Sequence, residues 1–128
     1  MTTSPIVEAR GLRKTYEHGR VRALDGIDLT IDPGSTVAIV GPTGAGKTTL
    51  AYLVPKFLAP TSGRVIVDGR DLAAVDTQSV RQQVSFVFQE HQLLTGTVRD
   101  NLAMAAPQAS DTEMEEALRA AGAWDFVA

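Results

Sequence analysis

One loop pattern in the first half of the chain restricts its fold more than any other feature. Residues 41–48 read Gly-Pro-Thr-Gly-Ala-Gly-Lys-Thr and fit the phosphate-binding loop (P-loop) pattern G-x-x-x-x-G-K-[ST]. An apolar run at residues 37–40 precedes the loop, and a segment of helical composition follows it. In such a loop backbone N–H groups turn inward after a strand, and the next helix N-terminus adds partial positive charge. We therefore expect an α/β unit that binds a nucleoside triphosphate.

The residue types in this loop have separate roles in phosphate binding. Glycines at three positions let the backbone close around phosphate oxygens, because they carry no Cβ atom. The Lys47 ammonium is a mobile positive charge for the outer phosphates, and the Thr48 hydroxyl is a candidate Mg²⁺ ligand. The candidate nucleotide-binding residues of the loop are Gly41, Pro42, Thr43, Gly44, Ala45, Gly46, Lys47, Thr48 and Thr49.

Composition and charge narrow the class of protein. A length of 128 residues with 44% hydrophobic and 21% charged residues is ordinary for one globular domain or part of one. The net charge of −3 and pI near 5.3 argue against a general nucleic-acid binder. Since there is no cysteine, disulfides and thiolate metal sites are excluded. No apolar stretch reaches the ~20 residues of a transmembrane helix, and the N-terminus lacks the features of a signal peptide.

Hydrophobic periodicity predicts a mixed α/β chain that becomes helical toward its end. The helix after Lys47 is expected to continue to about residue 58 with a kink at Pro55, which has no backbone N–H to donate. The order of elements indicates no separate second domain. Strands are expected at residues 6–10, 27–31, 37–40, 64–67 and 84–88.

Turn and capping residues predict where several elements begin. Asp68-Gly69 is a strong signal for a tight hairpin turn. Asp76 predicts the N-cap of a short helix at residues 77–83. Two further helix starts are predicted by Thr97 with Asp100 and by Ser110 with Glu113.

The sequence does not contain the full set of acidic residues that hydrolysis would need. Hydrolysis requires a carboxylate that holds Mg²⁺ and a group that activates or positions water. The apolar run at residues 65–68 ends in Asp68, but the turn signal there is the stronger interpretation. After residues 86–88, Gln89 occupies the metal-ligand place, and its amide oxygen can coordinate Mg²⁺ without neutralising its charge. Glu90 is either a general base or a solvent-exposed loop acid.

Taken together, these residues resemble the first half of the nucleotide-binding domain of an ATP-binding cassette (ABC) transporter, over nearly the whole chain. Residues 41–48 resemble the family's Walker A loop, and Tyr16 stands where the family places an aromatic ring that stacks on adenine. Gln89 resembles the Q-loop glutamine, which in the family contacts Mg²⁺ and the attacking water. Residues 94–102 resemble the exporter type more than the importer type.

This resemblance implies a fold class, a domain organisation and a set of ligands. The fold would be an α/β P-loop NTPase of the ABC type, with an N-terminal antiparallel β subdomain and the start of a helical subdomain. Residues 1–128 would form a partial nucleotide-binding domain, in which about 1–90 hold the β subdomain and P-loop core and about 91–128 the Q-loop and helical part. ATP and Mg²⁺ would be the cofactors, with Thr48 and Gln89 as metal ligands.

The resemblance also implies partners and a location. A second nucleotide-binding domain would form a head-to-tail dimer with this one, and transmembrane domains or subunits would hold both on the cytoplasmic side of the cell membrane. No nucleic-acid partner is implied. The parent protein would be an ATPase that couples Mg·ATP to transport, whereas the transported substrate cannot be derived from these residues.

Several family motifs do not occur in the sequence. The signature loop Leu-Ser-Gly-Gly-Gln, the Walker B aspartate with its catalytic glutamate, and the switch histidine would all lie beyond Ala128. We therefore expect an incomplete domain with open sheet edges, because in the family the Walker B strand lies beside the P-loop strand. The alternatives are a non-catalytic nucleotide-binding regulator and another P-loop NTPase, such as a kinase or GTPase. Such kinases usually carry the loop closer to the N-terminus, and the guanine motif Asn-Lys-x-Asp is absent.

We predict that the purified 128-residue chain turns over ATP weakly or not at all. It lacks the metal carboxylate, the base and the signature loop that would contact the γ-phosphate across a dimer. Steady-state phosphate release with Mg·ATP measures this, with the Lys47→Ala variant as background. Steady release above that background would contradict the prediction.

Overall fold

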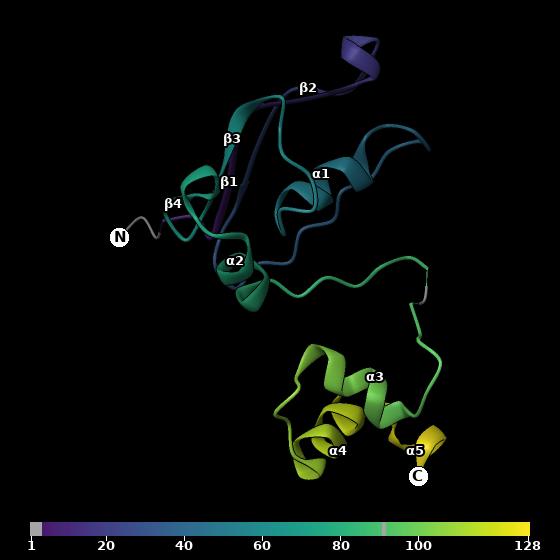
Figure 1. Cartoon of the computed structure of the whole chain (residues 1–128). Helices are drawn as coiled ribbons and strands as arrows, with labels where there is room; N and C mark the ends of the chain where they lie inside the picture. Colours follow the sequence, from purple (N-terminus) through teal and green to yellow (C-terminus); the bar gives the residue numbers. More distant parts are fainter. Residues whose placement is uncertain (1–3, 91) are drawn as a thin grey trace. The chain divides into compact units, whose positions relative to one another are not determined.

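The protein is described by a computed structural model that covers residues 4–90 and 92–128. It consists of two compact units, one extending to Phe86 and the other beginning at Val87. In the first unit the elements are β1 (Val7–Tyr16), η1 (Glu17–Gly19), β2 (Val21–Ile31), α1 (Lys47–Leu53), β3 (Ser62–Val67), β4 (Arg70–Asp71), η2 (Leu72–Ala74) and α2 (Thr77–Gln83). The second unit contains α3 (Val98–Ala105), α4 (Asp111–Ala120) and α5 (Trp124–Val127) (Figure 1).

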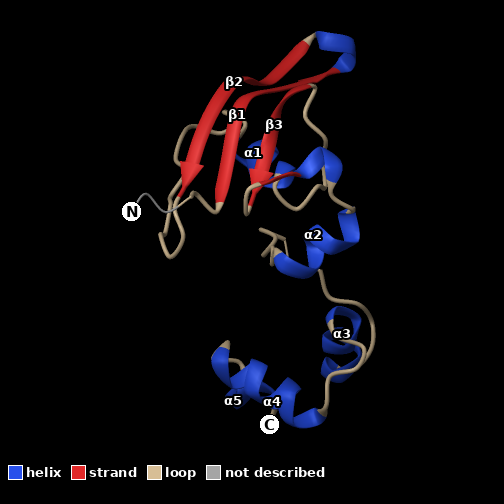
Figure 2. Cartoon of the chain, turned by 90° about the vertical axis from the view of Figure 1, so that its left-hand side faces the viewer, coloured by secondary structure: helices blue, strands red, loops and turns tan. Residues whose placement is uncertain are grey.

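A four-stranded antiparallel sheet is the frame of the first unit. Its strand order is β2-β1-β3-β4, and β1 pairs with β2 on one side and with β3 on the other (Figure 2). The register of β1 against β2 shifts between Ala9 and Leu12, where Gly11 has a φ of 54°. At this bulge the Gly11 N–H donates to the Asp28 carboxylate at 2.7 Å, so it stays hydrogen-bonded where the ladder is interrupted. The expected N-terminal antiparallel sheet is confirmed.

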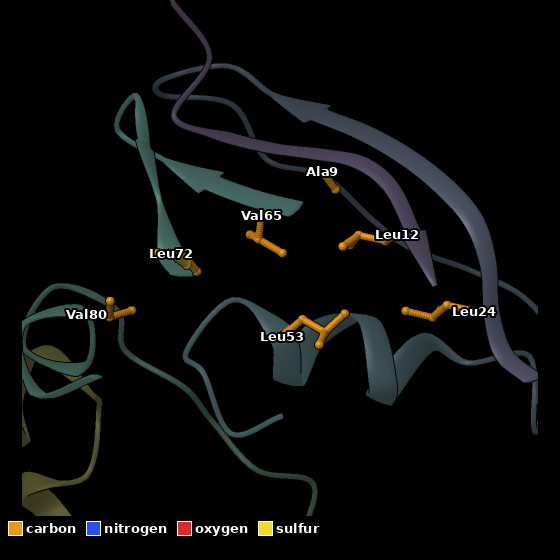
Figure 3. Close-up of a cluster of buried hydrophobic side chains, with 7 residues drawn as sticks. All are labelled: Ala9, Leu12, Leu24, Leu53, Val65, Leu72 and Val80. Atoms are coloured by element: carbon orange, nitrogen blue, oxygen red, sulfur yellow. The ribbon is translucent and has the colours of Figure 1, made fainter. Parts of the chain in front are cut away.

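The hydrophobic core lies between one face of this sheet and the helical segments that pack on it. Its seven buried side chains are at most 6% exposed, and each contributes about 1.5–3 kcal/mol through burial when it is a Val or Leu. Leu53 anchors α1 in this core, and Val80 anchors α2. Figure 3 shows the set, which comprises Ala9, Leu12, Leu24, Leu53, Val65, Leu72 and Val80.

The turn and cap predictions in the first unit are confirmed. Asp68 and Gly69 have φ values of 49° and 71°, and they join β3 to β4 with Val67 paired to Arg70. Two positive φ values in a two-residue hairpin loop define a type I′ turn, which explains the Asp-Gly sequence. The Asp76 side chain accepts from the Ser79 N–H at 3.0 Å and so caps α2.

Both helix starts predicted in the second unit are capping boxes. Thr97 and Asp100 exchange side chain–backbone hydrogen bonds at the start of α3, and Ser110 and Glu113 do so at the start of α4. These hydrogen bonds from backbone and hydroxyl donors hold the pKa values of the Asp100 and Glu113 carboxyls below their ordinary values. Among the residues that the structure describes, no helix has the length and apolarity needed to span a membrane.

Two of the predicted strands are wrong. Residues 37–40 and 84–88 form no strand, and within the described ranges neither segment takes part in a ladder. The side chains of Val40 and Val87 are 87% and 94% exposed. Apolar composition favours a strand, but a strand also needs a neighbour whose N–H and C=O groups pair with its own.

The helix after Lys47 is shorter than predicted. It ends at Leu53 instead of continuing through a kink to residue 58. Pro55 has no N–H for the next helical hydrogen bond, and Lys56 adopts a left-handed φ of 56°. The Phe57 N–H then donates to the Tyr52 carbonyl at 3.0 Å, which closes the helix end.

We predict that Gly63→Ala destabilises the first unit by about 1–3 kcal/mol. Gly63 has a φ of 83°, and a Cβ atom there would overlap the Gly11 carbonyl oxygen and lie 2.6 Å from that of Arg10. Urea denaturation monitored by circular dichroism measures the loss. Ser62→Ala, at the exposed neighbour, is the matched control and should change the free energy of unfolding by about 0.5 kcal/mol or less. Equal stability of the two variants would contradict the role of Gly63.

Candidate nucleotide-binding site

The P-loop adopts a conformation that depends on its glycines. Gly44 and Gly46 have φ values of 82° and 89°, in the left-handed region that side chains rarely adopt. Gly46 is also the N-cap of α1, and the Leu50 N–H donates to its carbonyl at 2.9 Å. A Cβ atom on Gly46 would overlap the carbonyl oxygen of Ala23 in β2. The loop can therefore lie this close to the sheet only with glycine at position 46.

The Lys47 ammonium is held at the loop itself. Its Nζ donates to the carbonyl oxygens of Gly41 at 2.8 Å and of Pro42 at 2.7 Å. These carbonyls accept two of the three N–H donors of an ammonium, so a phosphate oxygen can accept the third. The Ala45 N–H donates to the Pro42 carbonyl at 3.2 Å and tightens the turn. The Lys47 ammonium is thus fixed against the start of the loop.

The remaining predicted loop residues surround this lysine. Thr48 lies in the first turn of α1 and is exposed, so its hydroxyl is accessible to a metal ion. The next residue, Thr49, is half-buried. In the described parts of the chain, no three His, Asp or Glu side chains lie close enough together to hold a metal. Gly41, Pro42, Thr43, Gly44 and Ala45 are all exposed.

Tyr16 lies at the end of β1, in the same unit as the loop. It pairs across the hairpin with Val21, two residues before Ala23, which is the residue that Gly46 approaches. The structure therefore brings the P-loop against the end of the hairpin that carries Tyr16. Tyr16 is 36% exposed, and the Lys14 ammonium lies 5.3 Å from the centroid of its ring.

Gln89, the remaining predicted site residue, belongs to the second unit. It is exposed and lies in a bend after the irregular segment at residues 84–88. The geometry of the first unit thus joins Tyr16 to the P-loop, whereas the predicted role of Gln89 stays a prediction.

Sequence reasoning missed two contributors to this site. The Ala23 carbonyl oxygen occupies the space that a side chain at position 46 would need, and no side-chain pattern signals such a close approach. Lys14 stacks on Tyr16 while its Nζ donates to the Ala59 carbonyl at 2.7 Å. The pairing of Lys14 and Tyr16 on alternate residues of one strand was the available signal, because residues i and i+2 share a face of a strand.

A family comparison and individual relatives agree on the class of this chain. The profile of the ABC transporter family matches residues 24–128. A fatty acid ABC transporter ATP-binding/permease protein of Mycobacterium bovis is 45% identical over 121 residues, which cover 90% of this chain and 19% of that protein. An ATP-dependent lipid A-core flippase of Chromobacterium violaceum is 48% identical over 105 residues, which cover 82% of this chain and 18% of the flippase. A mycobactin import ATP-binding/permease protein of Mycobacterium tuberculosis is 40% identical over 124 residues, which cover 97% of this chain and 21% of that protein.

Solved structures give the same result at the level of the fold. The structure of a bacterial Atm1-family ABC exporter with ATP bound matches 98% of this chain with a TM-score of 0.88 and 36% sequence identity. The match covers 22% of that exporter chain. This chain therefore spans about a fifth of the length of the relatives that it matches.

We predict that Gly46→Ala weakens the binding of a nucleoside triphosphate at least about tenfold, a free-energy loss of about 1.4 kcal/mol. The added Cβ displaces the loop from Ala23 and disturbs the N–H groups that face the phosphates. Titration with a fluorescent ATP analogue measures the affinity. Gly69→Ala is the control, because Gly69 has a φ of 71° and open space around its Cβ position. The idea fails if both variants bind the analogue like the unchanged chain.

Proposed function

The chain belongs to the ABC transporter family and has the fold of its ATPases, and we propose that it binds Mg·ATP as the ATP-binding part of a transporter subunit. The observation that carries this proposal is the close approach of Gly46 to β2. That contact sets a phosphate-binding loop beside an exposed tyrosine at the end of the hairpin. In this proposal Tyr16 would be the platform for the base and residues 41–48 the cradle for the phosphates, both in one unit.

Different groups of the loop would contact different phosphates of the nucleotide. Backbone N–H groups between Gly41 and Thr48 donate to phosphate oxygens, and Lys47 adds its third N–H to the outer phosphates. Mg²⁺ supplies the positive charge that neutralises the phosphates when it is bound. The Thr48 hydroxyl and the Gln89 amide oxygen are the ligands that we assign to it.

Tyr16 would hold the adenine ring by stacking. Lys14 covers the Tyr16 ring at 5.3 Å from its centroid and is anchored to the Ala59 carbonyl, so one side of the ring is occupied. The opposite side is then the platform for adenine. Lys14 therefore restricts the base to one face of the tyrosine.

The activity of the whole transporter follows from this binding in our proposal. Two nucleotide-binding domains associate head to tail around ATP, and this association drives transmembrane domains between conformations on the cytoplasmic side of the membrane. Hydrolysis resets the pair. The names of the relatives refer to a fatty acid transporter, a lipid A-core flippase and a mycobactin importer, so these proteins differ in cargo. Cargo is therefore left open.

The proposed roles of Lys47 and Tyr16 can be separated with two ligands. Lys47→Ala should weaken both Mg·ATP and inorganic tripolyphosphate about 10- to 100-fold, because a charge-assisted hydrogen bond contributes about 1.5–3 kcal/mol. Tyr16→Ala should weaken Mg·ATP about 5- to 100-fold, since base stacking contributes about 1–3 kcal/mol. The same variant should bind tripolyphosphate unchanged. Isothermal titration calorimetry measures both ligands.

Tyr16→Phe is the matched control, because it keeps the aromatic face and removes only the hydroxyl. It should bind Mg·ATP within about twofold of the unchanged chain, a difference of about 0.4 kcal/mol. An equal loss of ATP and tripolyphosphate affinity in Tyr16→Ala would argue against an adenine platform. Unchanged ATP binding in Lys47→Ala would reject the site itself.

A further inference from the structure

The first unit carries a small cleft outside the candidate nucleotide-binding site. It lies between the β3–β4 hairpin and α2 and has a volume of about 130 Å³. Sites for drug-sized ligands measure about 300–1,000 Å³, so an occupant of this cleft is a molecule the size of a single amino acid. The residues that line it all fall between Val67 and Val84, within one compact unit.

The floor of this cleft is aliphatic and belongs in part to the hydrophobic core. Leu72 and Val80 are 6% and 5% exposed, and they lie at the same end of the core in Figure 3. Because core side chains are closely packed, this floor is formed before any ligand arrives. A branched aliphatic group that displaced water from it would be stabilised by burial of apolar surface. The aliphatic lining consists of Val67, Leu72, Val75, Val80 and Val84.

Two opposite charges stand at the hairpin side of the cleft. Asp68 and Arg70 flank Gly69 at the type I′ turn, and both are exposed. Within residues 4–90 and 92–128 neither side chain has a hydrogen-bond or ion-pair partner, so the two do not neutralise each other. Their backbone is fixed, because the Asp68 N–H donates to the Ile6 carbonyl at 2.9 Å and Arg70 pairs with Val67. A carboxylate and a guanidinium held in one cleft in this way complement a ligand that carries both signs.

The helix side of the cleft adds neutral hydrogen-bonding groups. Ser79 and Gln83 both line the cleft and are four residues apart, so they share one face of α2. The Ser79 hydroxyl donates to the Asp76 carboxylate at 3.5 Å, so its oxygen can still accept, and the Gln83 amide can donate and accept. The helix is held by its Asp76 cap and by Val80 in the core. The cleft thus combines a charged wall, a neutral polar wall and an aliphatic floor.

We propose that this cleft binds a free α-amino acid with a branched aliphatic side chain. The ammonium group of the ligand would donate to the Asp68 carboxylate, its carboxylate would accept from the Arg70 guanidinium, and its side chain would cover the aliphatic floor. A fatty acid would leave Asp68 without a partner, and an aliphatic amine would leave Arg70 without one. This site is separate from the proposed ATP site, because none of its residues belongs to the P-loop or to Tyr16.

L-Leucine is the probe, and nuclear magnetic resonance of the isotope-labelled full chain measures its binding. The amide signals of Gly69 and of residues 79–83 should shift in a saturable way, with a Kd of about 1 mM or below. Three analogues each lack one feature of the ligand. Isocaproate lacks the ammonium group, isoamylamine lacks the carboxylate and glycine lacks the aliphatic side chain. Each analogue should bind at least about tenfold more weakly than L-leucine.

Asp68→Asn and Arg70→Gln test the two charges. Asparagine tolerates the left-handed φ of 49° at position 68, so the first variant keeps the turn. Each variant should weaken L-leucine about 10- to 100-fold, because each removes a charge-assisted hydrogen bond. Asp68→Asn should bind isocaproate like the unchanged chain, since that analogue has no ammonium group. Arg64→Gln is the matched control, because Arg64 is an exposed arginine of β3 that does not line the cleft, and it should stay within about twofold.

Three results would overturn the proposal. One is the absence of a saturable shift up to about 10 mM L-leucine, ten times the expected Kd. Another is equal binding of L-leucine and all three analogues, and the third is an equal loss of affinity in Arg64→Gln and Arg70→Gln. Lys47→Ala and Tyr16→Ala should bind L-leucine unchanged, because neither residue lines the cleft. Failure of this proposal therefore leaves the proposed ATP site unaffected.

Discussion

The packing of α1 against the antiparallel sheet is the contact on which the rest of the first unit depends. Leu53 of α1 meets Leu12 and Leu24 of the hairpin in the core, and Gly46 at the start of the helix approaches the Ala23 carbonyl. Because a helix is rigid over seven residues, these contacts at its two ends set the direction of its N-terminus. The P-loop takes its position from that direction, so hydrophobic packing also sets the geometry of the candidate nucleotide site.

The two units of the chain carry net charges of opposite sign. The first 86 residues contain ten basic and eight acidic residues, a slight positive excess that is compatible with the proposed binding of a polyanion. The remaining residues carry a net charge of −5, with their two arginines used in ion pairs. The total of −3 conceals this division. A chain that is weakly acidic in composition therefore has one weakly basic part and one strongly acidic part.

Local signals in the sequence predicted local structure well. The Asp68-Gly69 turn, the Asp76 cap and the capping box at Thr97 are each made by hydrogen bonds within a few residues, so the residues that determine them are adjacent in the chain. The two strand predictions that failed concern pairing, whereas the helix after Lys47 was predicted too long at its C-terminal end. Residues 37–40 and 84–88 have strand composition, but a strand forms only where another segment supplies the matching N–H and C=O groups.

The sequence by itself determined the chemistry of the P-loop, its family and most turns and caps, because these depend on residue types at fixed short spacings. The tertiary structure decided which distant residues meet. It set Gly46 against Ala23, and through the pairing of Tyr16 with Val21 it put a tyrosine beside the loop. It also formed a largely apolar groove from three short helices. These features need contacts between segments that are far apart in the chain, and their free energy comes from packing and strand pairing that no single segment encodes.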